Sequence, residues 1–291
     1  DNKANGTSGN RGYYVKTNAP AVIAKYLAIF NQDRDANHDD IVALGTAPYA
    51  WDGSTVPSNC SDGTFYPIQK PAPLDLSGTF PFEVVQCPDN CLHYDESLLG
   101  MVRRAGAGDL VLVEQAYERK YWGAGTQSPP FTDPNPRVEA YIEAARRGAR
   151  VRILLDGKCD DATSARGNAN TVPYINSFAN INVDIQARLV DSPGTGSFCD
   201  GGLGPAGTGI HAKIVTVYKP LQNTAWVHIG SINGSENSSK FNREMALQIE
   251  SVEAFRYIYD LFNYDWRYTC GKNGNPVCNI FYLPALLRNA P

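Results

Sequence analysis

The alternation of apolar and polar positions predicts two neighbouring strands in the last third of the chain. Residues 210–218 (Ile-His-Ala-Lys-Ile-Val-Thr-Val-Tyr) alternate and are rich in β-branched side chains, which is typical of a strand. Residues 224–230 (Thr-Ala-Trp-Val-His-Ile-Gly) have the same character and lead into a Gly-Ser-Ile-Asn turn. Side chains two positions apart on a strand point to one face, so this pattern places His211 beside Lys213.

Helix and strand patterns alternate upstream of this pair. Residues 92–106 and 137–148 are predicted helices, and a glycine ends the second one. Residues 109–114 and 150–156 are predicted strands with apolar centres. This alternation continues to Trp266 and is typical of the α/β class.

The residues around the two C-terminal strands carry the candidate chemistry. An imidazole (His211), an ammonium (Lys213), a hydroxyl (Ser231) and an amide (Asn233) can together hold a tetrahedral anion and attack it. A histidine on a strand is ordinarily structural when it stands alone, and it is the combination that favours catalysis.

The sequence His211-x-Lys213, the turn Gly230-Ser231-x-Asn233 and the later Glu244 resemble the signature of the phospholipase D superfamily. Two departures stand out. The family's Asp falls on Tyr218, and residues 219–223 look like a hairpin insertion before Gly230. Glu244 occupies the place where the family often keeps an acidic residue that orients the histidine.

The resemblance implies a mixed β-sheet flanked by helices on both faces, and metal-independent phosphodiester chemistry without a cofactor. In such chemistry one histidine attacks phosphorus to form a phosphohistidine, and a second histidine protonates the leaving oxygen. His211 is expected in one of these two roles. Lys213 and Asn233 are expected to bind phosphate with support from Ser231, and Glu244 to orient the imidazole.

Three function classes remain open. The first is a secreted phospholipase D-like enzyme that acts on phospholipid head groups, the second a nuclease of the same superfamily, and the third a catalytically degenerate binding or assembly protein. The net charge of −4 gives no general attraction to nucleic acid, which favours phospholipid as the substrate. No run of 18 apolar residues occurs, so no membrane span is expected.

The cysteines indicate disulfides and an oxidising, extracellular or periplasmic location. Most of the seven lie in loops rich in Gly, Pro, Asn and Ser, and they form no zinc set with the four histidines. Cys270 with Cys278 and Cys159 with Cys199 are candidate pairs, although spacing does not fix connectivity. The odd number leaves one thiol without a partner in the chain.

A weak internal repeat suggests a second half. Residues 10–34 align without gaps to residues 242–266, and each copy predicts a strand followed by an amphipathic helix that ends in Phe-Asn-x-Asp. Proteins of the resembled family usually carry two such halves. We therefore expect a partner half, as a separate chain or a second copy. The expected division is 1–36 as the tail of a first half, 37–79 as an irregular linker, 80–270 as the second half and 271–291 as an extension.

Overall fold

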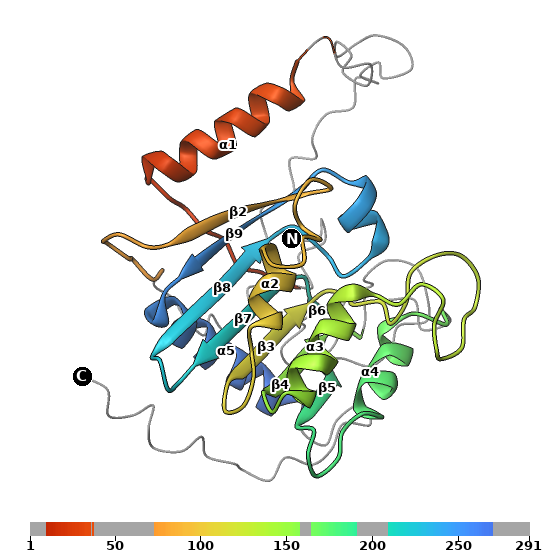
Figure 1. Cartoon of the computed structure of the whole chain (residues 1–291). Coiled ribbons are helices and arrows are strands. Elements are labelled where there is room, and N and C mark those ends of the chain that lie inside the picture. Colours follow the sequence, from red (N-terminus) through yellow and green to blue (C-terminus); the bar gives the residue numbers. More distant parts are fainter. Residues whose placement is uncertain (1–9, 36, 38–72, 158–163, 191–208, 270–291) are drawn as a thin grey trace, which may run out of the picture.

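The computed structural model describes residues 10–35, 37, 73–157, 164–190 and 209–269 (Figure 1). The helices and strands are β1 (Asn10–Arg11), α1 (Pro20–Asp33), β2 (Phe82–Cys87), α2 (Ser97–Arg103), β3 (Leu110–Gln115), α3 (Pro136–Arg146), β4 (Arg150–Leu155), α4 (Asn168–Asn176), β5 (Ile185–Leu189), β6 (Gly209–Ile210), β7 (Lys213–Lys219), β8 (Thr224–Gly230), the π-helical turn η1 (Asn237–Phe241), β9 (Glu244–Glu250) and α5 (Val252–Tyr268).

Seven strands form one mixed sheet in the order β2-β9-β8-β7-β3-β4-β5. β3, β4 and β5 run parallel, and β7 pairs antiparallel with β3. β8, β9 and β2 continue the sheet as antiparallel neighbours. As a result, β3, β4 and β8 end at the same edge of the sheet at which β7 and β9 begin. The polar residues that follow or precede these strands therefore gather at this edge.

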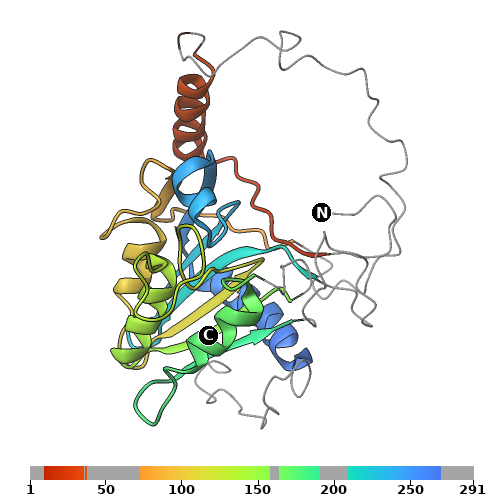
Figure 2. The same cartoon turned by 90° about the vertical axis from the view of Figure 1, so that its right-hand side faces the viewer.

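Helices cover both faces of the sheet (Figures 1 and 2). On one face Val113 and Val215 pack with Tyr141 of α3, in a core that also includes α2 and α4. On the other face Ile214 packs with Phe255 of α5. Successive residues such as Ile214 and Val215 thus point to opposite cores, as the period of a strand requires. The predicted α/β fold with helices on both faces is confirmed.

Local sequence signals set the ends of the helices beside the sheet. Asn135 caps α3 by accepting a hydrogen bond from the Arg137 amide at 3.0 Å, and the helix begins at Pro136. Gly148 follows the helix with a φ of +92°, a conformation that glycine adopts without strain. Ser251 caps α5 in the same way as Asn135 caps α3, through the Ala254 amide at 3.1 Å.

Two predicted elements differ from the structure. The predicted strand 210–218 is divided, because the chain pairs with β1 up to Ile210 and joins the large sheet only from Lys213. His211 therefore lies between β6 and β7 rather than within a strand. The predicted helix 92–106 is limited to Ser97–Arg103. A disulfide-closed turn at residues 87–91 and a loop before Ser97 occupy the chain upstream.

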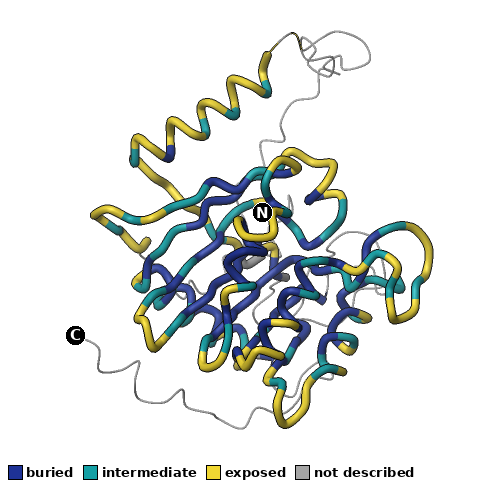
Figure 3. Tube along the Cα trace, in the orientation of Figure 1, coloured by how far each residue is buried: buried dark blue, intermediate teal, exposed yellow. Residues whose placement is uncertain are grey.

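The first repeat copy lies at the edge of the sheet. α1 runs along β2 and buries Val22 against Val84 and Leu247, while most of its surface is exposed (Figure 3). Residues 12–18, which the repeat aligns with β9, contain no strand. The division into halves stays a prediction. The proposed cysteine pairs, the C-terminal extension and most of the linker lie outside the described residues.

Candidate active site

The predicted site residues lie together at the edge where β7 and β9 begin and β8 ends. Lys213 is the first residue of β7, and Glu244 is the first residue of β9. Ser231 and Asn233 follow the last residue of β8, and His211 precedes β7 by two positions. The hairpin between β7 and β8 brings His211 and Asn233 from separate segments to one place.

His211 and Lys213 form the centre of this edge. The Lys213 ammonium donates a hydrogen bond to the His211 carbonyl oxygen at 2.8 Å. Partial desolvation of the imidazole and the charge of Lys213 lower the pKa of His211 to about 4, although the residue keeps an exposed surface. The ring is therefore neutral at pH 7, which leaves a nitrogen lone pair for attack or proton transfer.

Lys213 is buried and feels the charges of two carboxylates. Its side chain is largely buried, and desolvation lowers the pKa of its ammonium to about 8. The charges of Glu244 and Asp156 oppose this fall and favour the protonated form. Asp156 directly follows β4, is fully buried, and accepts a hydrogen bond from the Ile210 amide at 3.1 Å. The sequence analysis gave Asp156 no role, although its place at the end of a buried strand was visible.

The Gly230–Asn233 turn is fixed to β9 by backbone pairing. The Ser231 amide donates to the Met245 carbonyl at 2.9 Å, and the Ser231 hydroxyl accepts from the Met245 amide at 3.1 Å. A side chain at Gly230 would clash with Met245 and Ala246, since its Cβ would lie 2.3 Å from the Met245 oxygen. These contacts give a structural reason for glycine at position 230 and for serine at position 231.

A buried polar network supports the same turn from the side of α3. Arg137 donates to Glu118 at 2.5 Å and to the Ile232 carbonyl at 3.3 Å. The Asn135 side-chain nitrogen donates to the Gly234 carbonyl at 3.1 Å, and the Tyr141 hydroxyl donates to Glu118 at 3.1 Å. Burial raises the pKa of the Glu118 carboxyl, and Arg137 opposes that rise. This network was not foreseen from the sequence.

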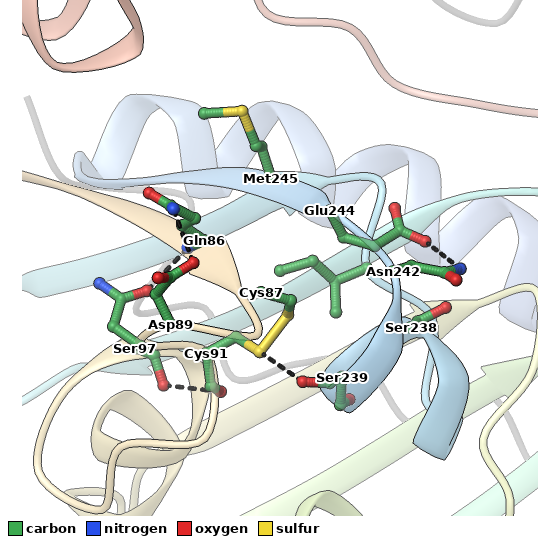
Figure 4. Close-up of a disulfide and its surroundings, with 12 residues drawn as sticks. Gln86, Cys87, Asp89, Cys91, Ser97, Ser238, Ser239, Asn242, Glu244 and Met245 are labelled. Carbon is green, nitrogen blue, oxygen red and sulfur yellow. Dashed lines mark hydrogen bonds between the residues drawn. A yellow bond between two sulfur atoms is a disulfide. The ribbon is translucent and has the colours of Figure 1, made fainter. Parts of the chain in front are cut away.

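Glu244 lies beside a disulfide between Cys87 and Cys91 (Figure 4). Cys87 is the register partner of Glu244, and both cysteines pack in one cluster with Ile232 of the turn. The Asn242 side-chain nitrogen donates to the Glu244 carboxylate at 3.3 Å. The Glu244 carboxylate thus interacts with the Asn242 side chain and with the charge of Lys213. Its role in orienting the imidazole stays a prediction.

The other described histidines stand apart from this site. His228 is fully buried on β8, where its Nδ1 lies 3.0 Å from the Gln248 side-chain oxygen. His93 is exposed and lies 3.2 Å from Glu96. Tyr218, which stands at the Asp position of the resembled signature, stacks on Phe255 with ring centroids 4.7 Å apart, on the face of the sheet opposite to Lys213. Its side chain is part of the α5 core and takes no part in the site.

The described ranges contain neither a candidate metal site nor a candidate membrane-spanning helix. These ranges contain no group of three or more His, Cys, Asp and Glu side chains that could hold a metal ion. In the same ranges no helix combines the length and the apolar character needed to cross a membrane.

A family model described as "Cardiolipin synthase, PLD-like domain" matches residues 126–266, which is just under half of the chain. This segment includes α3, the strands β4 to β9 and all the predicted site residues. No curated protein matches the chain at a significant level.

The chain is also similar to solved structures at low identity. Nuc from Salmonella typhimurium, a phospholipase D family member, is 18% identical over 65% of this chain and 95% of its own, with a TM-score of 0.41. NucT from Helicobacter pylori is 16% identical over 65% of this chain and 96% of its own, with a TM-score of 0.44. Polyphosphate kinase from Porphyromonas gingivalis is 14% identical over 69% of this chain and 27% of its own, with a TM-score of 0.41.

Proposed function

Because residues 126–266 match the family model of a phospholipase D-like domain, we propose that this protein hydrolyses or transfers a phosphodiester at the edge that carries His211 and Lys213. The observation that carries the proposal is the pairing of these two residues. A neutral imidazole stands beside a buried ammonium that two carboxylates keep protonated. This combination presents a nucleophile next to a positive charge that attracts phosphate oxygens.

The proposed reaction has two displacements at phosphorus. A His211 ring nitrogen forms a bond to phosphorus, the bond to the leaving oxygen breaks, and a general acid protonates that oxygen. Water or an alcohol then attacks the phosphohistidine, the phosphorus–nitrogen bond breaks, and the proton of the attacking group passes to the same acid, now acting as base. Lys213 and Asn233 neutralise and orient the non-bridging oxygens. With the roles reversed, His211 would be the acid and a second histidine the nucleophile.

The second histidine is proposed to come from another half or another copy of the chain. His93 and His228 are the other histidines in the described ranges, and both make contacts away from His211. Two histidines are required because one must stay covalently bound to phosphorus while the other transfers protons. Activity should therefore depend on assembly, and it should fall on dilution if the partner is a second copy.

Phospholipid head groups are the proposed substrate. The matching family model carries the words cardiolipin synthase, and the acidic net charge of −4 gives no general attraction to nucleic acid. The Cys87–Cys91 disulfide supports the proposed location in an oxidising compartment, because reducing compartments keep such cysteines as thiols.

A nuclease is the second candidate, and one observation favours it. Cationic side chains surround the loops next to Asn233. Arg119 stacks on Tyr117, and its amide donates to the Gly234 carbonyl at 2.9 Å. Lys240 lies 5.1 Å from the Trp122 ring, and Arg166 donates to the Gly123 carbonyl at 2.5 Å. A cation beside a partly exposed ring, as at Arg119 and Tyr117, is typical of single-stranded nucleic-acid binding, whereas the Trp122 ring is buried and offers no stacking surface.

Hydrolysis of a chromogenic phosphodiester in the presence of a chelator tests the proposal. We expect turnover by the wild-type protein and none by His211→Ala, because the substitution removes the nucleophile or acid. Unchanged hydrolysis by His211→Ala would refute the assignment. Phospholipid vesicles and single-stranded DNA, compared as substrates at equal phosphodiester concentration, then separate the two candidates.

A further inference from the structure

Gln115 is a buried carboxamide at the centre of the site edge. It is the last residue of β3 and the direct register partner of Lys213 on β7. Side chains of directly opposed residues in an antiparallel pair lie on the same face, with Cβ atoms about 5 Å apart. Gln115 has no exposed surface, and Lys213 is 7% exposed. A ligand that reaches the Lys213 ammonium therefore comes close to the Gln115 side chain.

Both polar atoms of the Gln115 side chain are buried and lack a hydrogen-bond partner within the described ranges. Gln248 provides the contrast on the same sheet. It is equally buried, but its oxygen lies 3.0 Å from His228 Nδ1 and its amide nitrogen donates to Glu83 at 2.7 Å. An unpaired buried carboxamide destabilises the folded protein, whereas a paired one does not. The stability of the folded protein thus explains a buried glutamine at position 248, but it does not explain one at position 115.

A second carboxamide lies on the other side of Lys213. Asn233 follows β8, which is the other neighbour of β7, and its side-chain oxygen is also buried without a partner among the described residues. Lys213 therefore lies on the strand between Gln115, the last residue of β3, and Asn233, which comes three residues after the end of β8. An oxyanion centred on the ammonium would have a carboxamide on either side.

We propose that Gln115 is a phosphate-binding residue, whose amide N–H donates to a non-bridging oxygen of the phosphate that Lys213 neutralises. This role rests on the proposed function, which places phosphate at Lys213. It adds a binding group that neither the His-x-Lys nor the Gly-Ser-x-Asn motif contains. The Gln115 amide does not have to break a hydrogen bond within the described protein in order to bind phosphate. The new bond therefore contributes fully to affinity for the bound oxyanion.

Two measurements test this role. Isothermal titration calorimetry measures the affinity for inorganic phosphate, and thermal unfolding of the same proteins measures their stability. The variant is Gln115→Met, which keeps the length of the side chain and removes its polar atoms. The matched control is Gln248→Met, the same change at the paired glutamine. We expect Gln115→Met to weaken phosphate binding about tenfold, as the loss of one hydrogen bond to a charged group predicts. Its melting temperature should equal or exceed that of the wild type.

Gln248→Met should show the reverse, with unchanged phosphate affinity and a lower melting temperature, because it leaves His228 and Glu83 without their partner. The proposal is overturned if Gln115→Met binds phosphate as the wild type does, if it loses stability as Gln248→Met does, or if the wild type binds no phosphate. Binding is measured without turnover. A wild type that binds phosphate through Gln115 but hydrolyses no phosphodiester would refute the proposed function and leave this role standing.

Discussion

The guanidinium of Arg137 in the first turn of α3 donates to the main-chain carbonyl of Ile232, 95 positions further along the chain, at 3.3 Å. Ile232 is the third residue of the turn that carries Ser231 and Asn233. The other end of the guanidinium is paired with Glu118 at 2.5 Å. The Arg137 side chain thus links α3 to the loop that carries Asn233, and its ion pair with Glu118 is buried.

The substitution Glu118→Gln should destabilise the protein by about 3 kcal/mol, because it leaves the Arg137 guanidinium buried without its counter-charge. The exposed pair Arg146–Glu143 supplies the control. The same change at Glu143 should cost less than about 1 kcal/mol, since an exposed pair is screened by solvent. Chemical denaturation of both variants gives the comparison, and equal losses would show that burial of the first pair has no energetic weight.

Gly234→Ala should displace the turn that carries Asn233. A Cβ at this position would lie 1.8 Å from a carboxylate oxygen of Glu118 and 2.8 Å from its Cα, so the backbone has to move. We expect a fall of about 100-fold in kcat/KM, as a displacement of about 1 Å at a catalytic group predicts. Gly106→Ala is the control, because its Cβ would meet only the Arg147 carbonyl at 3.8 Å. Similar kinetics of the two variants would contradict the prediction.

The pH dependence of kcat/KM should have an ascending limb near pH 4 and a descending limb near pH 8. As the nucleophile, His211 must be neutral; its pKa is about 4, so activity rises as the pH increases through that value. It also needs a protonated Lys213, whose pKa is about 8, so it falls above that value. Lys213→Arg should remove the limb near pH 8, because a guanidinium stays protonated. An ascending limb near the ordinary histidine pKa of about 6.5 would contradict the prediction.

His228 should make the folded protein less stable as the pH falls from 6.5 toward 3. Burial lowers the pKa of His228 from 6.5 to about 3 in the folded state. Between these values the unfolded chain binds a proton that the folded protein does not, so stability increases with pH by up to about 1.4 kcal/mol per unit. His228→Gln should reduce the slope by one proton while keeping a donor for Gln248. An unchanged slope in urea unfolding between pH 4 and 6 would refute this assignment.

Local pattern was sufficient for much of the fold. The strand at Thr224–Gly230 follows the predicted bounds, and α3 begins and ends within two residues of the helix predicted at 137–148. Both depend on neighbours in the sequence, through side-chain alternation in the strand and through capping by Asn135 and Gly148 in the helix. The grouping of His211, Lys213, Ser231 and Asn233 was also visible, because two adjacent antiparallel strands bring their ends together, whereas Glu244 was added from the resemblance to the family signature.

The tertiary structure alone decided what those residues touch. The chain changes strand partner between Ile210 and Lys213, which no periodicity indicates, and His211 lies in the gap. The neutrality of His211 follows from partial desolvation and from the charge of Lys213. Glu118 meets Arg137, and Gln115 faces Lys213 without a partner among the described residues, only because distant strands and helices pack together. Sequence determined the types of side chain available at this edge. Long-range packing determined how far these side chains are buried and which partners they have. Burial and partners in turn determine their protonation states.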